Sequence, residues 1–133
     1  MRRLAWLALL AAMLSAAPSS AHAQTSGLCT GISGTPVAYA HEVLSISSSA
    51  VALTAAVYAP AGKAPRMAQA TLETTNIRFW IDGTTPTASV GHLIALPSGV
   101  LSGTFTICGQ ANIAAFRAIA TSGTASLTVT YLQ

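Results

Sequence analysis

The chain has 133 residues, of which 52% are hydrophobic and 7% are charged. This length is typical of one domain, and so little charge together with many Val, Ile, Leu and Thr residues excludes a disordered protein. Beyond residue 23 the net charge is +1, from Lys63, Arg66, Arg78, Arg117, Glu42, Glu73 and Asp82. Nucleic-acid-binding domains carry a clustered basic face, so four scattered cations argue against a nucleic-acid partner.

The first 23 residues have the pattern of a secretion signal. Arg2 and Arg3 precede an uncharged apolar run over residues 4–14, and the segment ends in Ala21-His22-Ala23. Small residues such as Ala21 and Ala23, separated by one residue, mark a cleavage site, which is here expected before Gln24. The run is too short to cross a bilayer, which needs about 20 residues. We expect an exported protein (periplasmic or extracellular) with one domain over 24–133 and no membrane contact after cleavage, the alternative being a permanent N-terminal anchor.

The domain contains two cysteines, Cys29 and Cys108. Because an oxidising compartment favours pairing of two exported cysteines, the sequence predicts a disulfide between them. The alternative is two separate buried thiols. A bridge of this span would tie the extended, Gly- and Ser-rich segment 24–36 to a strand near the C-terminus.

Alternating apolar residues predict strands in the first half of the domain. The first is expected over 43–47 and the second over 50–58, where Val51 and Val57 share a face. Residues 60–65 (PAGKAP) form a loop. The clearest strand is expected over 68–82, with Ile77 and Phe79 on one face, and Asp82-Gly83 begins a turn.

The second half of the domain continues the pattern with strands over 90–96, 101–108 and 126–132. Residues 113–120 fit a helical turn or a strand, and we favour a short irregular lead-in before a further strand over 116–120. TSGT at 121–124 forms a hairpin turn. The total is about seven short strands at spacings typical of a sandwich or jelly roll. The fold class is therefore predicted to be all-β, as an antiparallel β-sandwich of jelly-roll type.

The sequence offers no recognisable catalytic apparatus. Nucleophilic catalysis needs a base beside the nucleophile, commonly a histidine oriented by a carboxylate. Beyond residue 23 the histidines are His41 and His92, and Glu42 would point to the opposite face of a strand from His41. No G-x-S-x-G motif occurs, and the cysteines lack the C-x-x-C spacing of zinc sites. We expect no enzyme activity, no metal site and no cofactor.

The segment from Arg78 to His92 is the best candidate for an interface. Arg78 and Trp80 share the strand face opposite Ile77 and Phe79, and a tryptophan beside an arginine is a common interface anchor. The candidate interface residues are Arg78, Trp80, Thr84 and His92. Two structural alternatives stay open: the face is covered by the second sheet or by the 60–65 loop, and His92 hydrogen bonds to the turn after Asp82.

Two stretches of the chain resemble small β-rich structural proteins of tailed bacteriophages. The first has the pattern R-x-x-I/V-D-G-T-x-P-T-A-S-x-G-H, and the second has the pattern F-R-A-I-x-T followed by L-x-V-T-Y. The matching residues are Arg78, Ile81, Asp82, Gly83, Thr84, Pro86, Thr87, Ala88, Ser89, Gly91, His92, Phe116, Arg117, Ala118, Ile119, Thr121, Leu127, Val129, Thr130 and Tyr131. The resemblance implies a virion-associated structural or decoration role, or a phage-derived domain that is exported.

Two functions follow as hypotheses. The first is a non-enzymatic structural or interaction module that associates with itself or with other structural proteins through its sheet edges or its Trp80 face. The second is a secreted module that binds a carbohydrate or another cell-surface partner with Arg78, Trp80 and the loop over 83–92.

Overall fold

The computed structural model describes Cys29 and residues 34–133; the expected leader and its cleavage site lie outside this part. The strands are β1 Ala38–Ile46, β2 Val51–Ala52, β3 Met67–Glu73, β4 Ile77–Trp80, β5 His92–Ile94, β6 Ser102–Cys108, β7 Arg117–Ala120 and β8 Ala125–Leu132. The helices are α1 Ala55–Tyr58 and α2 Gln110–Ala115. None of the helices described is long and apolar enough to span a bilayer.

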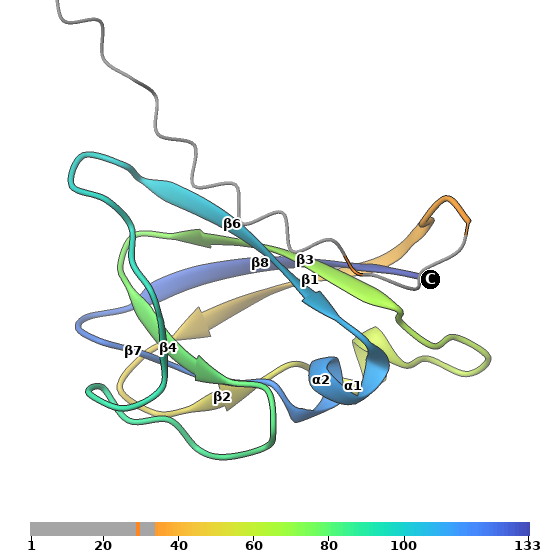
Figure 1. Ribbon diagram of the computed structural model, residues 1–133, viewed down its shortest axis with the longest axis horizontal. Helices are drawn as coiled ribbons and strands as arrows, with labels where there is room; N and C mark the ends of the chain where they lie inside the picture. The colour runs from red at the N-terminus through yellow and green to blue at the C-terminus, as the bar shows by residue number, and fades with distance from the viewer. Residues whose placement is uncertain (1–28, 30–33) are drawn as a thin grey trace, which may run out of the picture.

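The strands form two four-stranded antiparallel sheets, in the orders β1-β8-β3-β6 and β2-β7-β4-β5. The sheets face each other (Figure 1). The predicted all-β antiparallel fold is confirmed, with eight strands in place of about seven. Strand β1 pairs with β8, β2 with β7, β3 with β6, and β4 with β5. The pairing is therefore nested, and the jelly-roll part of the predicted fold stays a prediction.

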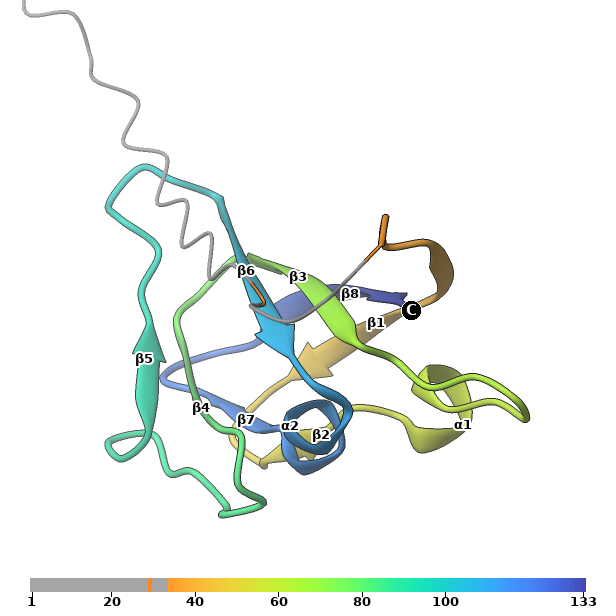
Figure 2. The same cartoon turned by 45° about the vertical axis from the view of Figure 1, so that its right-hand side comes forward.

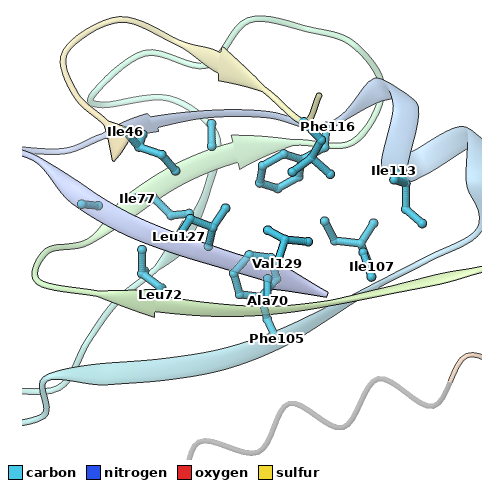
Figure 3. Packing of buried hydrophobic residues seen from close by; sticks show 14 of the residues in the cluster. Ile46, Ala70, Leu72, Ile77, Phe105, Ile107, Ile113, Phe116, Leu127 and Val129 are labelled. Atoms are coloured by element: carbon cyan, nitrogen blue, oxygen red, sulfur yellow. The ribbon is translucent and has the colours of Figure 1, made fainter. Parts of the chain in front are cut away.

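The core lies between the two sheets and is entirely apolar at its centre (Figure 3). β8 shows why the sequence folds this way: Leu127, Val129 and Tyr131 are fully buried, while Thr128 and Thr130 between them point outward. Side chains of successive strand residues point to opposite faces. β8 lies between β1 and β3, so its inward residues form the centre of the first sheet.

The strand expected over 68–82 is in fact two strands in different sheets. β3 ends at Glu73, which pairs with Ser126, and β4 begins at Ile77, which pairs with Ala120. Thr74, between them, has φ of 83°. Such a left-handed backbone conformation reverses the chain. The prediction was wrong because it missed a shift in the alternation of buried and exposed residues. Leu72 and Ile77 are both buried, although a continuous strand would place them on opposite faces.

The strand expected over 50–58 was also wrong in its second half. Only Val51 and Ala52 are in a strand, and Ala55–Tyr58 form one turn of helix. Alanine is the best helix former, and the turn buries Tyr58 against Tyr131 with ring centroids 5.9 Å apart. The favoured irregular lead-in before residue 116 is instead helix α2, in agreement with the alternative of a helical turn.

The predicted disulfide is present. Cys29 and Cys108 are bonded, with their Cα atoms 5.3 Å apart, and they are 79 positions apart in sequence. Cys108 is the last residue of β6. The bridge therefore fixes the chain at Cys29 to one edge strand of the first sheet.

Candidate interaction surface

Arg78 attaches the loop over 82–92 to β4. Its Nε donates a hydrogen bond of 3.2 Å to the carbonyl oxygen of Ala88, and its Nη1 donates one of 2.8 Å to that of Gly91. A guanidinium presents several N–H donors in a fixed planar fork, so one side chain holds two points of the loop. Arg78 therefore has the positioning role that the sequence analysis gave, as an alternative, to His92.

The loop is also stabilised by bonds within itself. The backbone N–H of Thr84 donates to Asp82 Oδ1 at 2.9 Å, and this bond is the main cause of a lowered pKa of the Asp82 carboxyl. The N–H of Val90 donates to Thr87 Oγ1 at 3.0 Å. Pro86 is fully buried beneath these turns. The loop is therefore a built part of the fold, and the exposed Thr84 contributes to it through its backbone.

Gly91 allows the loop to return close to β4. Its φ is 132°, and a Cβ atom there would lie 3.2 Å from the carbonyl oxygen of Phe79 and 3.3 Å from the Cβ atoms of Arg78 and Pro86. Side chains rarely adopt this backbone conformation, and real Cβ contacts are seldom so short. This is why the chain has glycine immediately before β5.

Trp80 and His92 meet at one end of β4 and β5. Their ring centroids lie 4.8 Å apart in an edge-on arrangement, and Trp80 is half-buried while His92 is exposed. Trp80 is paired in register with Arg117 on β7. Arg117 Nη1 donates to the carbonyl oxygen of Phe116 at 2.8 Å. The Trp80 side chain therefore has His92 and Arg117 as neighbours, and part of its surface stays accessible to solvent.

The structure brings two of the four candidate residues, Trp80 and His92, into contact, and His92 lies opposite Phe79 in the strand register. Arg78, Trp80 and His92 lie on the adjacent strands β4 and β5. Thr84 lies in the loop between these strands, and its backbone is bonded to Asp82. Neither the second sheet nor the 60–65 loop covers Trp80 completely, since its side chain is only half-buried.

Four exposed apolar side chains follow the β5–β6 edge of the sandwich, and we call them the apolar edge residues. Leu101 is 82% exposed, and the others are Val90, Leu93 and Val100. They lie on β5, on the chain either side of it, and immediately before β6. Sequence analysis missed them as a group because it placed Leu101 inside a strand and Val90 at the start of another. Val43, also exposed, lies on β1 at the opposite edge of the first sheet.

A part-buried polar contact links β1, β8 and the start of α1. The Tyr131 hydroxyl donates to Glu42 Oε1, and the backbone N–H of Thr54 donates to the same oxygen at 3.0 Å. Burial, and next the bond to Glu42, raises the pKa of the Tyr131 phenol. Glu42 shares the inward face of β1 with Ile46, and a carboxylate facing a core needs such partners. That inward position was the signal that sequence analysis did not use.

The titratable residues do not gather into a catalytic or metal-binding group in the part of the chain described. No three His, Cys, Asp or Glu side chains lie close enough there to hold a metal ion. His41 lies on β1 and His92 on β5, which belong to different sheets. Both histidines are exposed.

Comparison with known proteins returns no relative of this chain. No protein-family model matches it, and no match is found among curated proteins or solved structures. The resemblance to phage structural proteins thus stays a prediction from the sequence.

Proposed function

We propose that this protein is a non-enzymatic structural or interaction module, which acts after export by associating with copies of itself or with other structural proteins. The observation that carries the proposal is the row of apolar edge residues, headed by Leu101 at 82% exposure. Several exposed apolar side chains along one edge of a small domain favour a site that is covered by a partner. A nearly neutral charge adds little repulsion between copies.

The use of the charged side chains supports a structural role. Arg78 and Arg117 donate to backbone carbonyls, Asp82 accepts within a turn, and Glu42 accepts from Tyr131 and Thr54. Four of the seven charged residues beyond position 23 are thus used to hold loops and strands in place. Catalytic groups, in contrast, are typically directed into a cleft where a substrate can reach them.

A virion-associated or phage-derived origin is part of the proposal and depends on the sequence resemblance. The first matching stretch corresponds to β4 and the loop that Arg78 holds, and the second corresponds to β7, its turn and β8. β4 and β7 are neighbours in one sheet. The first stretch and the start of the second are therefore side by side in one sheet, while β8 contributes to the other sheet.

The test is the mass of the full exported chain in solution, measured by size-exclusion chromatography with light scattering over a range of concentrations. We expect self-association that weakens about tenfold or more in Leu101→Asp, because a charge would then be buried in the contact. Val43→Asp is the matched control, since Val43 is similarly exposed at the opposite edge. A strictly monomeric wild type that also binds no structural protein would contradict the proposal.

A second candidate is a secreted carbohydrate-binding module, favoured by the accessible part of Trp80 beside His92 and Arg117. Aromatic rings with adjacent polar groups suit the apolar and hydroxylated faces of a sugar. A glycan array with wild type and Trp80→Ala tests it. Binding that is lost in the variant would support this function, and an array without signal for the wild type would argue against it.

A further inference from the structure

β6 has a row of backbone groups with no strand beside them in the part of the chain that the structure describes. The N–H of Thr74 donates to the carbonyl of Leu101, and the N–H of Gly109 donates to that of Arg66. In an antiparallel pair, alternate residues bond to the neighbouring strand. With the uninterrupted register between β3 and β6, the odd-numbered residues of β6 bond to β3. The N–H and C=O groups of Ser102, Thr104 and Thr106 therefore face away from β3.

The other sheet edges in the described part are short or interrupted. β2 has two residues and β5 has three. β1 is longer, but its register shifts between Ala38 and Ala40, and Glu42 links it to the start of α1. Proteins avoid unwanted strand pairing with short edge strands, bulges and covering segments. Each of these three edges shows one of those devices.

β6 shows none of them. It has seven residues, SGTFTIC, without a charged residue or a proline. It is the outermost strand of its sheet, and no described strand lies beyond it (Figure 2). Thr104 is exposed, and Leu101, immediately before the strand, is the most exposed apolar residue described. Neither a charged residue of β6 nor a described strand therefore opposes pairing along residues 102–107 of this edge.

We propose that β6 pairs with β6 of a second copy of this chain, in antiparallel orientation, to give one continuous sheet across two molecules. This inference deepens the proposed self-association and rests on it. A second copy is the occupant that the edge fits, because an uncharged strand with a regular row of donors and acceptors is complementary to itself under a two-fold axis.

The free backbone groups also indicate a register. The carbonyl of Cys108 already accepts a hydrogen bond of 2.8 Å from Asn112 Nδ2, so Ser102, Thr104 and Thr106 are the residues with both groups free on this edge. The backbone groups of all three residues form hydrogen bonds when Thr104 lies opposite Thr104 of the second copy. Ser102 then lies opposite Thr106 of the second copy. Hydrogen-bonded antiparallel residues have Cα atoms about 5.5 Å apart.

The first test is a proline on the edge. Thr104→Pro removes the central free N–H and leaves the bonds to β3, and Thr104→Val is the matched control that keeps the N–H. We expect the dissociation constant of the wild-type pair to rise about tenfold or more in Thr104→Pro and to change little in Thr104→Val. Circular dichroism and the melting temperature of each variant show whether it is folded.

A cross-linking test does not depend on the proline variant being folded. Thr104→Cys should form an intermolecular disulfide in high yield, because the expected Cα separation falls within the range for such bonds. Thr71→Cys is the matched control, since Thr71 is paired with Thr104 one strand further in. Mass spectrometry under non-reducing conditions should then show the covalent pair for Thr104→Cys alone.

The outcomes separate this inference from the proposed function. If wild type associates but Thr104→Cys cross-links no better than Thr71→Cys, the β6 pairing is wrong and association occurs elsewhere. The same conclusion follows if a folded Thr104→Pro associates as tightly as wild type. If wild type is monomeric at every concentration, for example because a segment of the same chain covers the edge, both the pairing and the proposed self-association are wrong.

Discussion

Arg78 and Gly91 are joined by a hydrogen bond of 2.8 Å from the Arg78 guanidinium to the Gly91 carbonyl oxygen. Arg78 lies on β4, whereas Gly91 ends the loop that leads into β5. The same guanidinium also binds Ala88. Arg78, which the sequence marked as a candidate binding residue, is thus the anchor of the loop between β4 and β5.

Replacement of Arg78 by alanine should therefore loosen this loop. We expect the free energy of unfolding to fall by about 1–2 kcal/mol, since hydrogen bonds from charged groups are lost from a half-exposed site. Arg78→Lys keeps the charge but not the planar fork, so its loss should be intermediate. Urea denaturation followed by circular dichroism measures both. Equal stability of Arg78→Ala and wild type would show that the loop does not depend on this anchor.

The close approach at Gly91 gives a second prediction, with a matched control in the same loop. Gly91→Ala should lower the free energy of unfolding by about 1–3 kcal/mol, because the new Cβ atom would strain the backbone and also lie too close to the carbonyl oxygen of Phe79. Gly83 also has a positive φ, of 87°, but a Cβ there meets nothing within 4 Å. Gly83→Ala should therefore cost less. Thermal unfolding of the two variants checks the order, and a larger loss at Gly83 would contradict the described packing.

The disulfide between Cys29 and Cys108 should stabilise the fold mainly by restricting the unfolded chain. For a loop of this length we expect the free energy of unfolding to fall by about 2–4 kcal/mol when the disulfide is removed. The measurement is urea denaturation of wild type with and without a reducing agent, and of the double variant Cys29→Ser/Cys108→Ser. Reduced wild type and the double variant should agree. An unchanged urea midpoint after complete reduction would show that the bridge contributes nothing to stability.

The raised pKa of Tyr131 predicts a dependence of stability on alkaline pH. The folded protein holds the phenol protonated, so the stabilisation is complete below the unfolded pKa of about 10 and declines as the pH rises beyond it. Wild type should be more stable than Tyr131→Phe at pH 8, and the difference should shrink above pH 10. Denaturation at several pH values tests this. A difference that stays constant would mean that Tyr131 ionises as easily in the folded state.

The sequence was sufficient for the fold class because the strands are strongly alternating. In β8, the alternation of Leu127, Val129 and Tyr131 with threonines identifies both the strand and its buried face. Local alternation does not tell which sheet a strand joins. The change of sheet between Glu73 and Ile77 depends on a reversal at Thr74, which no glycine or proline announces.

The candidate surface was only partly predictable for a related reason. Trp80 and His92 were identified from their types and positions, and they do lie together. The free edge of β6 depends on which strand ends the sheet, and this order comes from long-range pairing. The contact of Glu42 with Tyr131 joins residues 89 positions apart. The free edge of β6 has no local signal, and the inward position of Glu42 indicates that it needs a partner without identifying Tyr131.

The central claim is that β6 is an ordered edge strand that becomes paired when copies of the protein meet. Hydrogen exchange of individual β6 amides, followed by NMR over a range of protein concentrations, tests it most directly. We predict that Phe105 and Ile107 are protected at every concentration, since they bond to β3, while Thr104 and Thr106 exchange fast in dilute protein and slowly in concentrated protein. Fast exchange of Thr104 and Thr106 in concentrated protein would contradict the claim.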